Sequence, residues 1–163
     1  MKIELRNLET SMPTEGELVE YQAEVWIDGA LAFEASSDGD FGQDVFIQVG
    51  SITRDEVDQW IGENRPGTSI DGIIYPADLG SEIADMVDTA AFSKIIEHTL
   101  KTKLVTIQDN QVVTYDLVGP RDLTIAALER EVPSALIVTA NDNALIVRAA
   151  RLLFKEPTNI GVN

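Results

Sequence analysis

The chain of 163 residues contains no cysteine. This absence excludes disulfide bonds, thiolate zinc sites, cysteine nucleophiles and thiol redox chemistry. Histidine is nearly absent too, since His98 is the only one, and most acid–base chemistry at neutral pH uses that side chain. His98 falls on the side of a predicted helix opposite its apolar residues, so we interpret it as a solvent-exposed histidine and predict no catalytic residue and no enzyme.

Several other signals are missing. The chain has no G-x-S-x-G elbow, no G-x-x-x-x-G-K-[ST] loop and no G-x-G-x-x-G turn, so no nucleophile elbow or phosphate cradle is predicted and we expect no cofactor. No apolar run approaches the ~18 residues that span a bilayer. Residues 1–8 alternate charged and apolar side chains, which is not the pattern of a signal peptide. We therefore expect a soluble, cytoplasmic protein.

Cations are scarce, with 12 Lys and Arg against 28 Asp and Glu, and the net charge is −16. The imbalance is concentrated in the first half. Between Glu15 and Glu63, 13 carboxylates stand against the single cation Arg54, which gives −12 over 49 residues. This charge opposes binding to nucleic acid or to an anionic membrane, because both would repel it. A basic protein surface is the partner that it favours.

Alternation of apolar and polar residues predicts an antiparallel sheet in the first half. Expected strands cover residues 2–8, 19–27, 31–36 and 45–49, and a further short strand covers 70–75. Asp28-Gly29 predicts a tight hairpin turn, and Asn7 to Gly16 is expected to be a loop. On the returning strand, we expect Leu31, Phe33 and Ala35 to be buried and Ala32, Glu34 and Ser36 to be exposed.

Helical signals dominate the rest of the chain. Thr53-Arg54-Asp55-Glu56 fits a capping box at a helix start. Residues 81–103 are predicted to form two helices or one kinked helix, because their apolar stripe changes direction near Thr89 to Ala91. Expected after these are a hairpin around Asp109-Asn110, a helix over 121–131, a buried strand over 135–139 and a last helix capped by Asn141 or Asp142. The fold class is α+β, with an N-terminal antiparallel sheet packed with helices and a C-terminal half made of a β-hairpin plus α-β-α. We expect one domain over 1–163, with two lobes, 1–76 and 77–163, as an alternative.

The carboxylates of the first half are predicted to share one face. Alternate residues of a strand project to the same side, about 6.6 Å apart, and the capped helix can add further acids. Trp26, between Glu24 and Asp28, is either an exposed apolar anchor or is buried under the loop after Asn7. The predicted partner-binding residues are Glu20, Glu24, Trp26, Asp28, Glu34, Asp55, Glu56 and Asp58.

Two alternatives stay open. Asp38, Asp40 and Asp44 lie between glycines and superficially resemble a calcium loop, so a small carboxylate-metal hydrolase or nuclease is one. The match departs from the pattern, because Gln43 stands where the loop glycine is expected and Val49 where the terminal glutamate is expected. In the other, the acids only keep a structural or assembly protein soluble, and such a protein would self-associate, for example as a homodimer.

Three segments carry a resemblance to a known group of proteins. They are Lys2 to Leu8, Tyr21 to Gly29 with Ser37-Asp38-Gly39, and the later Lys101 to Val105 with Leu117 to Pro120. The chain is similar in these segments to small uncharacterised acidic proteins carried by phages and plasmids. The resemblance implies a mobile genetic element, in which small acidic proteins often disable host nucleases as anti-CRISPR or anti-restriction inhibitors. The predicted function is inhibition of a nucleic-acid-binding defence protein by a face that mimics nucleic acid.

Overall fold

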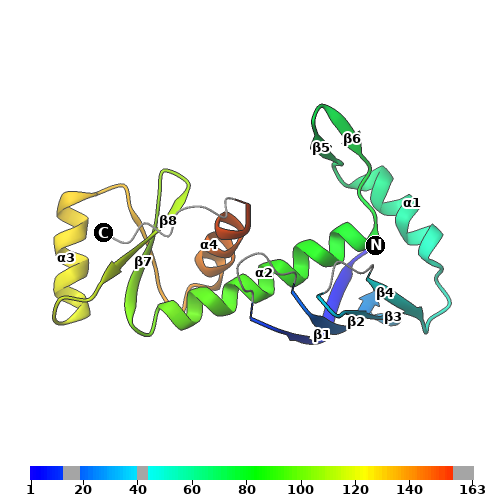
Figure 1. Cartoon of the computed structure of the whole chain (residues 1–163), viewed down its shortest axis with the longest axis horizontal. Coiled ribbons are helices and arrows are strands. Elements are labelled where there is room, and N and C mark those ends of the chain that lie inside the picture. Colours follow the sequence, from blue (N-terminus) through cyan, green and yellow to red (C-terminus); the bar gives the residue numbers. More distant parts are fainter. Residues whose placement is uncertain (13–18, 40–43, 156–163) are drawn as a thin grey trace. The chain divides into compact units, whose positions relative to one another are not determined.

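The computed structural model describes residues 1–12, 19–39 and 44–155 and shows an α+β fold (Figure 1). It forms two compact units, Met1–Val87 and Asp88–Asn163. The division falls inside helix α2 (Leu79–Thr99), whereas the alternative of two lobes divided the chain between residues 76 and 77.

The first unit contains a four-stranded antiparallel sheet in the order β1-β2-β3-β4. Its strands are β1 (Ile3–Thr10), β2 (Tyr21–Ile27), β3 (Ala30–Ser37) and β4 (Val45–Gln48). Asp28 and Gly29 make the predicted hairpin turn with φ of 51° and 85°. β1 runs on to Thr10, so the expectation that the loop begins at Asn7 is wrong, and residues 13–16 of that loop lie outside the described residues. Asn7 takes φ 50° where the pairing with β2 shifts, and this bulge lets the strand continue.

One face of this sheet, the inner face, is buried as predicted. Val19, Tyr21, Ala23, Val25 and Ile27 are all at most 9% exposed. The prediction that Ala32 is exposed is wrong, because Ala32 and Phe33 are both buried. The register shifts between Val25 and Trp26, and Ala32 is the additional residue on the opposite strand. A bulge of this kind breaks the strict alternation on which the prediction depended.

Helix α1 (Arg54–Asn64) begins at the predicted capping box. The Thr53 hydroxyl accepts from the Glu56 amide, and the Glu56 carboxylate accepts from the Thr53 amide at 2.8 Å. Val57 and Ile61 are fully buried. Arg54 stacks on the Phe46 ring at 4.8 Å, and Phe46 lies opposite the buried Ala35. α1 therefore packs on the inner side of the sheet.

We expect Thr53→Ala to lower the free energy of unfolding by about 1 kcal/mol, because helix amides lose their cap. Bonds from Thr53 lower the pKa of Glu56 from 4.5. A lowered folded pKa stabilises the chain above the unfolded pKa, and that contribution disappears as the pH falls through the folded value. The stability difference between wild type and Thr53→Ala should therefore narrow below about pH 4.5. Urea unfolding at several pH values measures it, and a difference that widens on acidification contradicts this assignment.

α2 is one continuous helix over Leu79–Thr99, so the alternative of two separate helices divided near Thr89 to Ala91 is wrong. The apolar stripe changes direction because the helix serves two cores. Its first half buries Leu79 and Ile83 in the first unit, and its second half buries Ile96 in the second. Among the described residues no helix, α2 included, combines the length and apolar character needed to cross a membrane.

Residues 68–75 form a two-stranded hairpin, β5 (Thr68–Ile70) and β6 (Ile73–Tyr75), rather than the single strand predicted. The missed turn is Asp71-Gly72, with φ of 50° and 79°. β5 and β6 pair only with each other among the described strands, and the hairpin projects from the unit (Figure 1). We call residues 68–75 the arm.

The second unit contains a three-stranded antiparallel sheet in the order β8-β7-β9. Its elements are β7 (Lys103–Gln108), β8 (Gln111–Asp116), α3 (Arg121–Glu131), β9 (Leu136–Val138) and α4 (Asn143–Lys155). The Asp109-Asn110 turn and the Asp142 cap are confirmed, with Asp142 accepting from the Leu145 amide at 3.0 Å. Of the predicted buried strand, Val138 is buried but Leu136 is 41% exposed. The core includes Ile96, Val105, Ile107, Val138 and Ile146.

Candidate functional site

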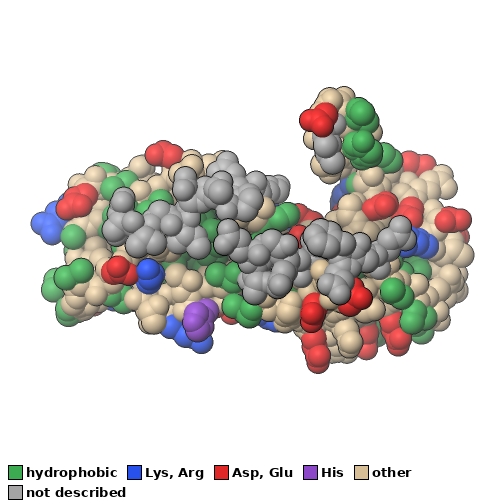
Figure 2. Space-filling view, viewed as in Figure 1, with side chains coloured by type: hydrophobic (Ala, Val, Ile, Leu, Met, Phe, Trp, Pro, Cys, Tyr) green, Lys and Arg blue, Asp and Glu red, His purple; other side chains and the backbone are tan. Residues whose placement is uncertain are grey.

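The face of the N-terminal sheet opposite the core, the outer face, carries most of the strand carboxylates. Strand pairing arranges its side chains in three rungs. The central rung is Arg6–Glu24–Glu34–Ile47, and it is flanked by Glu9–Gln22–Ser36–Val45 and by Glu4–Trp26–Leu31. Acidic side chains gather over the sheet in the space-filling view (Figure 2). The outer face is therefore acidic over β1 to β3 and apolar at β4.

Glu24 and Glu34 lie directly opposite each other on β2 and β3. Directly paired side chains have Cβ atoms about 4.5–5.5 Å apart, and like charges at that distance destabilise a sheet. Within the described part of the chain, Glu34 is exposed and has no hydrogen bond or ion pair to offset such repulsion. The Glu34 carboxylate thus faces solvent with a like charge directly across the strand pair.

Glu24 is held in place by its neighbours. Its carboxylate accepts from the Trp26 indole Nε1–H at 2.9 Å, and the Arg6 guanidinium stacks on the Trp26 ring at 4.0 Å. The hydrogen bond from Trp26, another from Asn7 and the charge of Arg6 lower the pKa of Glu24. The Glu24 carboxylate therefore stays ionised down to a lower pH than an ordinary glutamate side chain. Trp26 is only partly buried, and its indole N–H is already used within the chain.

The edge near β1 is partly neutralised. Lys2 and Arg6 both form ion pairs with Glu4, at 2.8 and 3.5 Å, and Lys2 lowers the pKa of that carboxyl most. The remaining negative charge of the outer face is centred on β2, β3 and the end of β1. It comes from Glu9, Glu20, Glu24 and Glu34.

Three predicted contact residues have structural roles instead. Asp28 accepts from the Lys2 amide at 2.7 Å and so joins the hairpin turn to β1. Glu56 is part of the capping box. Asp58 accepts from the Leu79 amide at 2.7 Å and pairs with Arg54 at 3.3 Å, which ties α1 to the start of α2. These carboxylates stabilise the first unit, and their substitution would disturb its fold.

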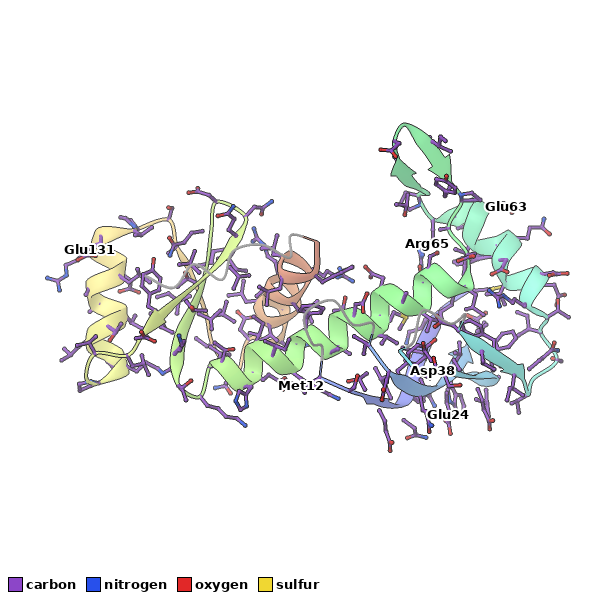
Figure 3. All side chains as sticks on the ribbon, viewed as in Figure 1. Met12, Glu24, Asp38, Glu63, Arg65 and Glu131 are labelled. Carbon is purple, nitrogen blue, oxygen red and sulfur yellow. The ribbon has the colours of Figure 1, made fainter. Side chains whose placement is uncertain are left out.

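The predicted acids do not form one continuous face. α1 packs on the inner side of the sheet, so its exposed acids, including Asp55, project away from the outer face. Figure 3 shows Glu24 on the side of the sheet away from α1, which carries Glu63. The candidate site is therefore smaller than predicted and lies on the sheet alone.

Glu9 belongs to this site but was missed because residues 7–16 were interpreted as a loop. It lies opposite Gln22, beyond the bulge at Asn7. The sequence signal that could have placed Glu9 on a strand is the alternation of side chains over Leu8, Glu9 and Thr10. Glu20 precedes β2, and its backbone oxygen accepts from the Ser11 amide at 3.0 Å, which continues the pairing with β1.

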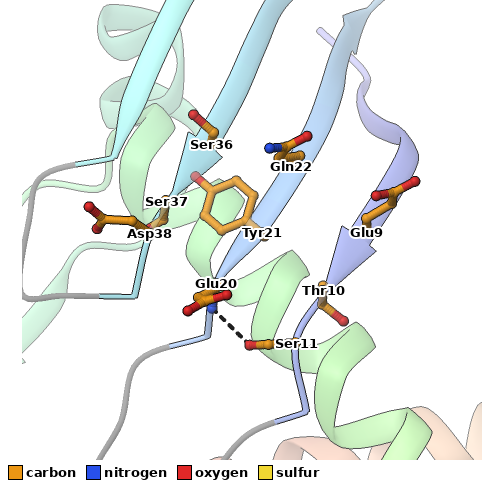
Figure 4. Close-up of a pocket in the computed structure, with 9 residues that line it drawn as sticks. All are labelled: Glu9, Thr10, Ser11, Glu20, Tyr21, Gln22, Ser36, Ser37 and Asp38. Carbon is orange, nitrogen blue, oxygen red and sulfur yellow. Dashed lines mark hydrogen bonds between the residues drawn. The ribbon is translucent and has the colours of Figure 1, made fainter.

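A hollow of about 570 Å³ is lined by residues at the end of β1, the start of β2 and the end of β3 (Figure 4). Tyr21 lies in it, and burial together with the neighbouring Asp44 carboxylate raises the pKa of the Tyr21 hydroxyl. Asp38 lines the hollow, whereas Asp40 lies outside the described residues.

Over residues 1–12, 19–39 and 44–155, no three acidic or histidine side chains come together as metal ligands. His98 is exposed, as predicted.

No protein-family model matches this chain, and no curated protein or solved structure gives a significant match to it. The resemblance to small acidic phage and plasmid proteins therefore stays a prediction.

Proposed function

We propose that this protein is a non-enzymatic binding protein that occupies a cationic, nucleic-acid-binding surface of another protein with its outer face. The observation that carries the proposal is the Glu24–Glu34 pair, two carboxylates held opposite each other at the centre of an exposed sheet face. Like charges placed directly opposite each other work against strand pairing in general, whereas they strengthen attraction to a partner of positive charge.

The spacing of the charges supports attraction to a groove that binds a phosphate backbone. Alternate residues on β2 are about 6.6 Å apart, while each DNA strand carries one charge per about 3.4 Å of helix axis. The outer face thus presents a sparser charge pattern than DNA, on a rigid support. It can occupy part of a basic groove and exclude nucleic acid from it, and it cannot reproduce a whole duplex.

In the mobile-element setting implied by the resemblance, the partner is a defence protein in the cytoplasm of a bacterial host, such as a nuclease. Such a protein lines its nucleic-acid groove with Lys and Arg. Blocking that groove inhibits the partner without any chemistry from the inhibitor.

The experiment is capture followed by competition. The immobilised full chain is exposed to bacterial lysate at low salt, and bound proteins are then eluted with a short DNA duplex. We expect the duplex to release a nucleic-acid-binding protein, because both ligands use one groove, and moderate salt to release it too. A captured protein that neither duplex nor salt displaces contradicts the proposal.

A further inference from the structure

The first unit has a second feature that the outer face does not explain. The arm exposes Ile73, Ile74 and Tyr75, which are 58%, 73% and 49% accessible. A two-stranded hairpin is marginally stable in water without further packing, and neither edge of this one is paired within the described chain. Three consecutive exposed apolar residues on such a hairpin mark a contact surface rather than ordinary solvent-facing structure.

A matching surface lies on the same unit. β4 is an edge strand, paired only with β3 within the described residues, and Val45, Ile47 and Val49 on or beside it are 51–57% exposed. Proteins usually protect edge strands with charged side chains, yet residues 45–52 contain none. The chain therefore carries both an unpaired apolar hairpin and an unpaired apolar sheet edge.

We propose that the arm of one copy pairs with β4 of a second copy, and that the reciprocal contact completes a two-fold symmetric dimer. Each contact would extend the four-stranded sheet by the two strands of the arm. Ile73 and Tyr75, two residues apart on one face of β6, match the spacing of Val45 and Ile47 on β4. Because a two-fold axis repeats the contact, each copy both donates an arm and accepts one.

Charge identifies a second copy as the occupant. Two chains of net charge −16 repel each other, and they can approach closely only through surfaces that carry little charge. The arm has Asp71 as its one charged residue, at the turn, and β4 has none. A basic partner would instead be drawn to the outer face. Screening by salt reduces the repulsion between the copies and should strengthen the dimer, opposite to its effect on capture of a partner through the outer face.

Sedimentation analysis of the full chain over a wide range of protein concentrations tests the proposal. We expect a monomer–dimer equilibrium that shifts toward dimer at higher salt. Ile73→Lys on the arm and Ile47→Lys on β4 should each weaken dimerisation on the order of 100-fold, because each substitution alters both symmetric contacts. Val118→Lys is the control, because Val118 is 85% exposed in the second unit and lies on neither surface.

A charge pair separates direct contact from an indirect effect. The double variant Ile47→Glu/Ile73→Lys places opposite charges across each contact and should regain dimerisation relative to either lysine variant. All these positions are exposed, so circular dichroism should show each variant folded. A wild-type chain that stays monomeric throughout overturns the proposal. So does loss of the dimer with Ile73→Lys but not with Ile47→Lys, which would indicate pairing between two arms.

Discussion

The double variant Glu20→Lys/Glu34→Lys is expected to bind the captured partner at least about 100-fold more weakly than the wild-type chain. Loss of one member of a close interfacial charge pair costs about 2–5 kcal/mol, and every 1.4 kcal/mol is tenfold in affinity. Glu20 and Glu34 are suitable because neither has a structural bond from its side chain in the described chain. At position 34, a lysine would also face Glu24 and replace repulsion with attraction. Isothermal titration with the purified partner gives the affinity.

The matched control is Glu63→Lys on α1. It changes the net charge by the same amount per site, and a cation in the last turn of a helix is favourable. Because α1 lies on the inner side of the sheet, we expect this variant to bind within a few-fold of the wild type. The reverse pattern, with binding lost in Glu63→Lys and kept in the double variant, would place the site on α1.

Phe33→Ala is expected to lower the free energy of unfolding of the first unit by about 3–5 kcal/mol. Phe33 is 1% exposed and lies opposite Val25 at the centre of the inner face. The cost combines lost burial of the ring with the cavity left behind. Against a typical total of about 5–15 kcal/mol, this single change removes a large share of the stability.

Tryptophan fluorescence assigns that loss to one unit. Trp26 and Trp60 are the two tryptophans of the chain, and both belong to the first unit. Their unfolding transition should move to lower denaturant in Phe33→Ala. Leu104→Ala in the second unit, where Leu104 is fully buried, is the comparison. An equal shift of the fluorescence transition in both variants would show that the two units unfold together.

Local signals predicted much of this fold. The alternation over β2, the Asp28-Gly29 and Asp109-Asn110 turns and the capping box at Thr53 each depend on a few adjacent residues, and each is confirmed. Where tertiary structure decides, the predictions were wrong. The bulge that buries Ala32 is a shift in the pairing of β2 with β3, and α2 continues through the change in direction of its apolar stripe, and alternation or helical periodicity alone predicts neither.

The candidate site was predicted in part for the same reason. Strand alternation placed Glu24 and Glu34 on one side of the sheet, as the structure has them. Glu56 was assigned to the contact set although the capping box already used its carboxylate. The bond from the Leu79 amide to Asp58 joins residues 21 positions apart, so no sequence pattern indicated it.

Glu34→Gln tests most directly whether the outer face exists for binding rather than for folding. The substitution keeps the shape of the side chain and removes one of the two opposed charges. We predict that its free energy of unfolding rises by about 0.2–1 kcal/mol while its affinity for the captured partner falls. A Glu34→Gln chain that binds the partner as tightly as the wild type would contradict the account, whatever its stability.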